Sequence, residues 1–321
     1  MRLKMFCLFA ACTAVLLAQT PRVAFLEIEI ENQVYYWFDV PDATRLAASA
    51  GPVANIPIRG FLGFVSIADI VSVNGKPAKG LWENRGERLT PSPSPAPTMA
   101  IANVTSGNHV YCAADLFTAD GTWVGKLTDG GLVGSLGPTH PILGGAGAFL
   151  GVVGEHGWVQ TITAARNASA AEDPSQRQIL GGGRLRIRYY LVPKQWPQVE
   201  ETADGPSVFH GADWSLVTAA KPARAGEVLM VRAKGLGPTR PDLLPAGFRP
   251  FPDNPVEVVN SPVEVNIGGR EAEVVNKVGW PGSYDLYRVD FRVPPSVTPG
   301  MATLRLTAAW ISGPEVKIPV Q

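Results

Sequence analysis

The sequence predicts an all-β protein of about two domains. Runs of β-branched and other apolar residues alternate with turns rich in glycine and proline, of which the chain has 34 and 29. Helical periodicity is almost absent, and only residues 43–50 read as a turn or two of helix. The length of 321 residues, 45% of them hydrophobic, suffices for about two domains with sizeable cores.

The N-terminal segment is typical of a secretory signal peptide. Two basic residues precede an apolar run over residues 5–18, which is shorter than the about 20 residues that span a bilayer. We expect cleavage after Ala18, and lipid attachment at Cys12 is the minority interpretation. The processed chain then keeps one cysteine, Cys112, and no internal disulfide. These features predict a secreted or cell-envelope protein without a transmembrane helix after signal removal.

Charge and motifs exclude several common functions. The chain has 28 Lys and Arg against 28 Asp and Glu, so its net charge is zero and no nucleic-acid partner is expected. There is no HExxH, no paired-cysteine spacing, no Asp-rich calcium loop and no GxSxG. We therefore predict no metal site, no cofactor and no catalytic residue.

The first strand signal is residues 23–31, where apolar and acidic residues alternate. Residues 184–192 alternate in the same way, with arginines on one face and Leu185, Ile187 and Tyr189 on the other. In an up-and-down barrel with an even number of strands, the first and last strands pair antiparallel. We expect Glu27, Glu29 and Glu31 to face Arg184, Arg186 and Arg188 in a solvent-exposed seam. The alternative is an arginine stripe that binds an anionic ligand.

The strand around residues 109–116 contains candidate ligand-binding residues. His109, Tyr111 and Asp115 share one face, and Cys112, Ala114 and Leu116 share the other. A solvated face is the favoured interpretation of the polar set. If that face turns inward, His109, Tyr111 and Asp115 would line a cavity together with Tyr189. Cys112 lies opposite His109, so a Cys–His nucleophile is not expected, and a small buried core residue is.

Residues 142–157 are unusually rich in glycine. We expect structural roles for five of these residues, Gly144, Gly145, Gly147, Gly151 and Gly154. Glycine in an apolar strand marks a bend or a close backbone approach, which a small closed barrel needs at its corners. A phosphate cradle would require GxGxxG or GxxxxGK[ST] leading into a helix, and neither is present.

The C-terminal part reads as a small β-sandwich. A polar, proline-bearing linker is expected at 194–206, between domains at 22–193 and 207–321. Strand patterns recur at 228–233, 263–267, 272–275, 287–293, 302–308 and 316–320. Hairpin turns are expected at Asn74-Gly75, Asp120-Gly121 and Gly268-Gly269. Phe248, Phe251, Trp280 and Tyr284 either form a loop-borne binding patch or pack against the core.

Two segments resemble known families. GGAGAFLGVVGEHG at 144–157 is similar to the GGTGxFxGAxG segment of dirigent and allene oxide cyclase-like barrels, with Ala146 in place of the usual Thr. The resemblance implies an eight-stranded antiparallel barrel with a central cavity that steers radical coupling or cyclisation, or simply binds. GEVLMVRAKGLGPTRP, SPVEVNIGGREAEVV and DLYRVDFRVPPSVTPG resemble the uncharacterised C-terminal domain of secreted Solibacter-type proteins, itself similar to immunoglobulin-like TIG domains. This implies an immunoglobulin-like extracellular module.

Two hypotheses of function follow. The favoured one is an exported, non-catalytic binding protein whose barrel holds a small apolar ligand or a partner, while the immunoglobulin-like domain acts as an adaptor to an envelope or extracellular component. The alternative is a cyclase- or dirigent-like enzyme that holds a reactive intermediate in the barrel cavity and needs few ionisable groups. An open cavity with His109, Tyr111 or Asp115 facing in would favour the alternative. A filled interior would count against it and leave the barrel as a scaffold.

Overall fold

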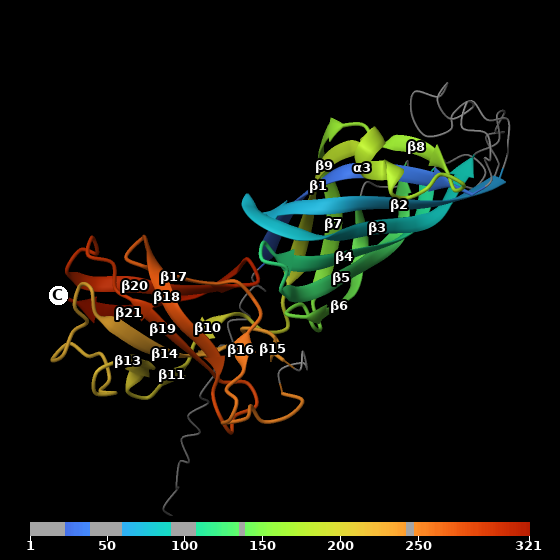
Figure 1. Ribbon diagram of the computed structural model, residues 1–321. Helices are drawn as coiled ribbons and strands as arrows, with labels where there is room; N and C mark the ends of the chain where they lie inside the picture. The colour runs from blue at the N-terminus through green and yellow to red at the C-terminus, as the bar shows by residue number, and fades with distance from the viewer. Residues whose placement is uncertain (1–22, 39–59, 91–106, 135–138, 242–246) are drawn as a thin grey trace, which may run out of the picture.

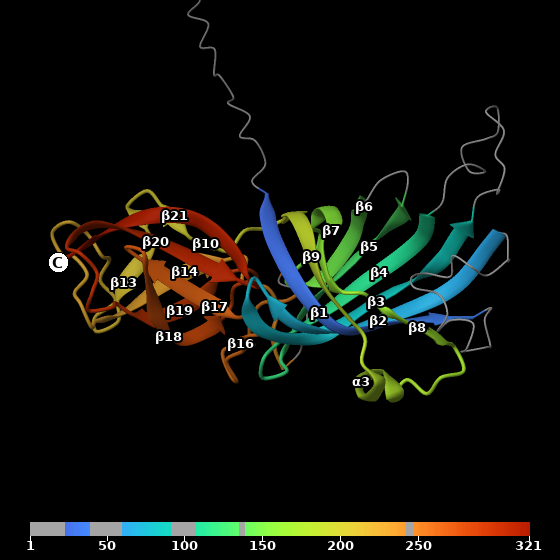
Figure 2. The ribbon, with the colours of Figure 1, turned by 90° about the horizontal axis from the view of Figure 1, so that it is seen from above.

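The structure, a computed structural model, describes residues 23–38, 60–90, 107–134, 139–241 and 247–321. These residues form two β-rich units that lie side by side (Figures 1 and 2). The signal peptide expected over 1–18, including Cys12, and the helical turn expected over 43–50 lie outside the described residues. Within the described part of the chain, no helix is long and apolar enough to cross a membrane.

The first unit is a closed antiparallel barrel, as predicted. Its strands follow the order β2-β3-β4-β5-β6-β7-β9-β1, and β1 also pairs with β2, which closes the cylinder. A short strand, β8, lies parallel to the end of β1 outside the barrel, and helix α3 (Gln176–Leu180) follows it. The bounds are β1 (Ala24–Trp37), β2 (Gly60–Val73), β3 (Lys76–Thr90), β4 (Gly107–Thr118), β5 (Trp123–Gly134), β6 (Thr139–Gly147), β7 (Val153–Thr163), β8 (Arg166–Ser169) and β9 (Gly183–Val192).

The predicted charged seam closes the barrel between β1 and β9. Glu27 stands opposite Arg188, and Glu29 stands opposite Arg186. The Arg188 and Glu27 side chains approach to 2.5 Å, Arg186 Nε lies 3.3 Å from a Glu29 oxygen, and Arg184 also pairs with Glu29. Cross-strand pairs of opposite charge contribute about 0.2–1 kcal/mol each. The seam is confirmed, and its arginines are paired with carboxylates.

Side chains that alternate with this seam fill the barrel interior. Leu185, Ile187 and Tyr189 are buried, as predicted, and Leu26 and Ile28 are fully buried opposite them. Full burial of an aliphatic side chain stabilises a fold by about 1.5–3 kcal/mol. The other large interior residues include Ile30, Trp37, Phe64, Trp82, Leu116, Leu127, Phe149 and Leu191.

Two of the predicted hairpin turns are confirmed by backbone conformation. Asn74 and Gly75, with φ of 51° and 74°, connect β2 to β3, and Gly268 and Gly269, with φ of 56° and 78°, connect two sandwich strands. Two successive residues with positive φ match a type I′ turn. The connection at Asp120-Gly121 is longer than the two residues predicted, because β4 ends at Thr118 and β5 begins at Trp123.

The second unit is a β-sandwich. Its path β10-β14-β19-β18-β17-β20-β21 bends at β18, which pairs with β17 near Ala272 and with β19 from Glu273 onward. Val199 in β10 is buried in its core, so the second unit begins inside the segment expected to be a linker. The bounds are β10 (Gln198–Val199), β11 (Glu201–Thr202), β12 (Gly205–Pro206), β13 (Val208–His210), β14 (Val228–Lys234), β15 (Thr239–Arg240), β16 (Val258–Val259), β17 (Val263–Ile267), β18 (Arg270–Gly279), β19 (Tyr287–Arg292), β20 (Gly300–Ala308) and β21 (Ile311–Val320).

The turn between β20 and β21 packs into one end of the barrel. Ala309, Trp310 and Ile311 are buried in the same hydrophobic cluster as the barrel core. The Asn74 Nδ2 donates a hydrogen bond of 3.1 Å to the Trp310 carbonyl oxygen. Lys76 forms an ion pair of 2.5 Å with Glu264 of the sandwich. The sandwich thus closes the end of the barrel that it contacts.

Candidate functional site

The four residues predicted to line a cavity do not come together. His109 and Tyr111 are exposed on the outer face of β4, and Asp115 is partly exposed there with an ion pair of 2.8 Å to Lys126. Only Tyr189 points inward, where it is fully buried. The inward placement of His109, Tyr111 and Asp115 is therefore wrong, and the solvated face is what the structure shows. The apolar face of β4 turns inward because burying it removes more hydrocarbon from water.

Of the five predicted structural glycines, Gly145, Gly147, Gly151 and Gly154 sit where a side chain would be strained or crowded. Gly154 is the clearest case, since its φ is 151° and an added Cβ would overlap the Tyr190 carbonyl oxygen. Gly144 differs, because the nearest atom to an added Cβ there is the Thr128 hydroxyl oxygen at 3.8 Å.

A buried polar cluster occupies the barrel interior at the level of Tyr189. Cys112 on β4 is opposite Asp129 on β5, His140 on β6 is opposite His156 on β7, and His156 is opposite Tyr189 on β9. Register therefore places these inward-facing side chains on neighbouring strands at similar heights in the barrel. Sequence reasoning missed this cluster because each member comes from a different strand and no short spacing joins them.

The cluster is centred on the Asp129 carboxylate. Asp129 Oδ1 lies 2.9 Å from His156 Nδ1 and 2.8 Å from His140 Nδ1. The two imidazole rings lie edge to face with centroids 4.7 Å apart, and the Tyr189 ring stacks on His156 at 4.7 Å. All of these side chains are almost completely buried.

Burial and mutual contact shift the ionisation of three members. Burial acts to raise the pKa of Asp129, but the contacts of its carboxylate with His140 and His156 outweigh burial and hold the pKa of this carboxyl well below its usual range. Burial and then the Asp129 charge raise the pKa of the Cys112 thiol and of the Tyr189 phenol well above their usual values. At neutral pH the cluster thus holds an ionised carboxylate beside a protonated thiol and a protonated phenol.

Several polar atoms of the cluster have no hydrogen-bond partner. They are Asp129 Oδ2, His140 Nδ1, His156 Nε2 and the Tyr189 hydroxyl. His140 Nδ1 lies 2.8 Å from Asp129 Oδ1 as an ion-pair contact rather than a hydrogen bond. Because about 90% or more of buried polar groups in proteins are paired, four such atoms in one place require an explanation. Carboxylate, imidazole and thiol together are the donors that transition metals prefer.

A second candidate site is an open, largely apolar hollow on the sandwich. It has a volume of about 490 Å³ and is lined by Trp214, Val256, Asn276, Val278, Trp280, Pro281 and Arg288. The two tryptophan rings are nearly perpendicular, with centroids 6.4 Å apart, and Trp214 is 51% exposed. Arg288 lies over the Trp214 ring at 4.8 Å, and its Nε donates to Asp290 at 2.8 Å. This hollow is hereafter the tryptophan pocket.

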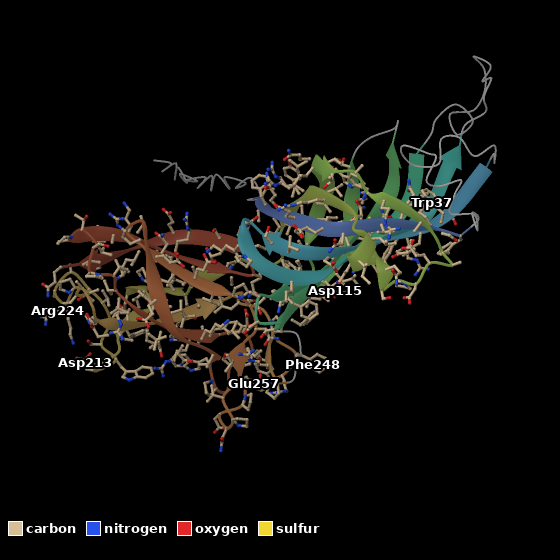
Figure 3. The ribbon with its side chains drawn as sticks, turned by 45° about the horizontal axis from the view of Figure 1, so that its top comes forward. Trp37, Asp115, Asp213, Arg224, Phe248 and Glu257 are labelled. Atoms are coloured by element: carbon tan, nitrogen blue, oxygen red, sulfur yellow. The ribbon has the colours of Figure 1, made fainter. Side chains whose placement is uncertain are left out.

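Among the four aromatic residues considered from sequence, only Trp280 lines this pocket. Phe251 is buried and packs on Tyr287 with ring centroids 5.1 Å apart. Phe248 and Tyr284 are exposed, and Phe248 is visible at the surface of the sandwich in Figure 3. Trp214 was not considered, because a single tryptophan in a loop carries no periodic signal.

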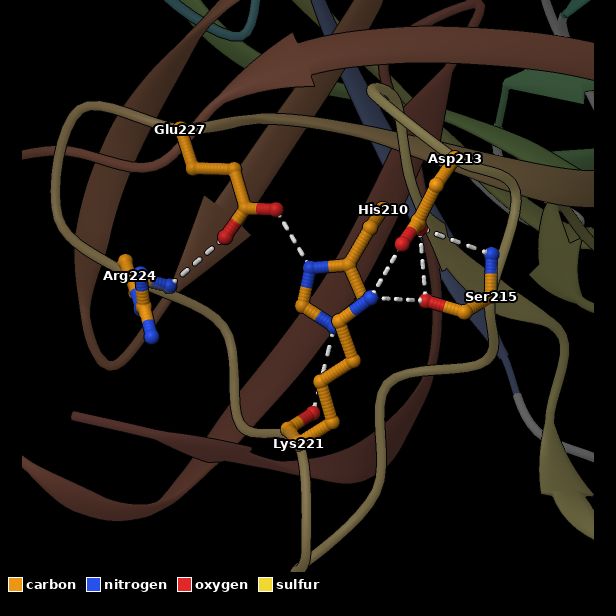
Figure 4. A network of polar contacts seen from close by, with 6 residues as sticks. All are labelled: His210, Asp213, Ser215, Lys221, Arg224 and Glu227. Carbon is orange, nitrogen blue, oxygen red and sulfur yellow. Dashed lines mark hydrogen bonds and ion pairs between the residues drawn. The ribbon is translucent and has the colours of Figure 1, made fainter.

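A network of polar contacts holds the loop that presents Trp214 (Figure 4). Lys221 Nζ donates to the Ser215 hydroxyl oxygen at 2.6 Å and pairs with Asp213. His210 bonds the Glu227 carboxylate through Nδ1 and faces the Lys221 carbonyl oxygen at 3.2 Å through Nε2. The Lys221 ammonium and then the Ser215 hydroxyl hold the pKa of the Asp213 carboxyl below its usual range. The network fixes the residues on both sides of Trp214.

The fold and sites define a two-domain, all-β protein with a closed barrel and a sandwich that carries an aromatic pocket. Comparisons of the chain with models of protein families, with curated proteins and with solved structures found no match. Its function is therefore inferred from the geometry of the described residues.

Proposed function

We propose that the protein is an exported binding protein that recognises a carbohydrate through the tryptophan pocket of its sandwich, with the barrel as a scaffold. The observation that carries the proposal is the conformation of Trp214. This residue is half exposed, yet its backbone is held at a φ of 60°, in the left-handed region that bulky residues rarely adopt. Strain of this kind costs about 1–3 kcal/mol, and it is concentrated at active sites, ligand-binding sites and switch regions.

The contacts around Trp214 support a preorganised surface. The Trp214 amide donates to the His210 carbonyl oxygen at 2.9 Å, and the adjacent Asp213 and Ser215 are tied to Lys221. A binding side chain that is already fixed loses less conformational entropy when a ligand arrives. Trp214 is therefore ready to bind without rearrangement of its loop.

The lining of the pocket supports a sugar ring as the ligand. Trp214 and Trp280 offer flat apolar surfaces, while Asn276 and Arg288 place polar groups at the edge. Binding sites for small molecules combine apolar surfaces with a few placed polar groups in this way. A sugar ring carries C–H groups on its face, which would pack on the tryptophan rings. Its edge carries hydroxyls, which would bond the polar groups of Asn276 and Arg288.

The barrel interior supports a scaffold role, and it counts against both the small apolar ligand expected inside the barrel and the cyclase alternative. Among the described residues, large side chains such as Trp82, Leu116 and Phe149 fill the space that a substrate would need. Trp310 of the sandwich closes one end. A cyclase or dirigent-like enzyme requires an open cavity in which an intermediate can be held.

The proposal is tested by binding of the full chain to a panel of soluble oligosaccharides, measured by calorimetry and by tryptophan fluorescence. We expect one class of glycan to bind and Trp214→Ala to weaken its binding at least about tenfold, which corresponds to about 1.4 kcal/mol. Phe248→Ala is the matched control, because Phe248 is 72% exposed and does not line the pocket. Absence of binding to every oligosaccharide of the panel, or equal glycan binding by Trp214→Ala, would contradict the proposal.

A further inference from the structure

Four side chains from four neighbouring strands converge inside the barrel. Cys112, Asp129, His140 and His156 each offer one donor atom, and these atoms all lie within 4.8 Å of one another. We propose that they form a metal centre for one zinc ion, or another late first-row divalent cation, in tetrahedral coordination. This inference is independent of the tryptophan pocket and of the function proposed for it.

The spacing of the donors is close to what such an ion needs. Zinc lies about 2.0–2.3 Å from its ligands, so tetrahedral donors are about 3.3–3.8 Å apart. The two nitrogen-to-oxygen distances of 2.8 and 2.9 Å around Asp129 are slightly shorter than this. Shifts of less than about 1 Å, within reach of side-chain rotation, would therefore open the cluster around the ion.

The unpaired atoms of the cluster support a ligand at this place. Asp129 Oδ2 and His140 Nδ1 have no hydrogen-bond partner, and their side chains are 0% and 2% exposed. A buried polar atom without a partner costs about 1–3 kcal/mol, and a buried charge costs more. Coordination to a cation would satisfy these atoms together.

The donor types select the metal class. A thiolate, two imidazoles and a carboxylate are a mixed set that suits zinc, cobalt, nickel or copper. Calcium and magnesium prefer sites built from six or more oxygen donors, and Asp129 is the one oxygen donor among these four residues. Metal binding would release the proton of the Cys112 thiol to solvent. The charges of the resulting thiolate and of the Asp129 carboxylate would then balance a divalent ion, so a filled centre would leave no net charge inside the barrel.

The surroundings indicate a structural centre. All four ligands come from the protein, and structural zinc sites are closed in this way, whereas catalytic sites keep one position for water or substrate. Tyr189 stacks on His156 and fixes its ring orientation. We therefore expect the ion to be bound as the barrel folds and to add to its stability.

The test is metal titration of the full chain after removal of bound metal by a chelator. We expect one equivalent of Co²⁺ per chain, with the absorption of a tetrahedral ion and a thiolate charge-transfer band, and competition by Zn²⁺ but not by Ca²⁺ or Mg²⁺. Cys112→Ser should remove the charge-transfer band, and Asp129→Asn should lower the affinity at least about a hundredfold. His109→Gln is the matched control, since His109 is exposed on the outer face of the same strand as Cys112.

Titration of the unaltered chain decides the outcome even if a variant fails to fold. A folded protein that takes up no Co²⁺ or Zn²⁺ would overturn the proposal and leave the cluster as a metal-free hydrogen-bonded network. Uptake that persists unchanged in Cys112→Ser and Asp129→Asn, or that is lost in His109→Gln, would place the ion elsewhere and also overturn it.

Discussion

Burial in the folded protein changes the pKa values of individual side chains. Lys277 is an example outside the two sites, because its ammonium group is partly buried and donates to the Ser261 carbonyl oxygen. Burial, with a smaller contribution from the Arg240 charge, lowers the pKa of Lys277 to about 8. The charged form is therefore less favourable in the folded protein than in the unfolded chain.

This shift predicts a pH-dependent stability. Unfolded lysine titrates near pH 10.4, so between about pH 8 and that value the unfolded chain binds more protons than the folded protein, and the free energy of unfolding rises with pH. Lys277→Met should be more stable than the wild type at pH 7 by about 1 kcal/mol, after allowance for solvent screening. The difference should disappear above about pH 10.

Urea unfolding at several pH values measures the Lys277 effect. Lys79→Met serves as the control because Lys79 is exposed, and it should leave the pH dependence unchanged. An effect of Lys277→Met that is constant from pH 7 to about pH 10 would show that the buried charge is not its cause.

At the scale of strands, the alternation of apolar and charged residues predicted much of the barrel. The cluster around Asp129 was not predicted, because it depends on the register between strands. The acidic and arginine stripes of β1 and β9 were predicted to face each other because both alternate and both lie on strands that close a barrel. Alternation alone does not say which face of β4 points inward, so His109 and Asp115 remained candidates. The cluster around Asp129 depends on register between strands that lie far apart in sequence, and no local pattern encodes it.

Two glycines, Gly144 in β6 and Gly154 in β7, offer a test at the same scale. Gly154→Ala should destabilise the protein by about 2 kcal/mol or more, because its positive φ and the nearby Tyr190 carbonyl leave no room for a Cβ. Gly144→Ala should change stability by about 0.5 kcal/mol or less, since the nearest atom to an added Cβ is 3.8 Å away. Thermal unfolding of the two variants measures the difference in stability. Equal effects would contradict the expectation that a Cβ is excluded at Gly154 and tolerated at Gly144.

At the scale of the whole molecule, the two units are joined by packing. Trp310 is 6% exposed and lies in the barrel core although it belongs to the sandwich turn. The segment expected to be a linker contributes β10 to the sandwich, so little free chain separates the units. The sequence predicted both units, but their contact depends on a turn whose role is visible only in three dimensions.

This contact predicts cooperative unfolding. Trp310→Ala should lower stability by about 3–5 kcal/mol, the usual cost of truncating a buried tryptophan, and should separate barrel and sandwich unfolding into two transitions. Calorimetry of the full chain measures this. Trp214→Ala is the control, because it removes a tryptophan that is 51% exposed and outside the contact. A single unshifted transition in Trp310→Ala would show that the units are not coupled through this residue.

The metal centre proposed inside the barrel is tested most directly by a crystal of the zinc-treated full chain, measured with X-rays on both sides of the zinc absorption edge. We predict one anomalous peak inside the barrel, bounded by Cys112, Asp129, His140 and His156. Direct hydrogen bonds among these side chains, with no peak between them, would contradict the proposed centre.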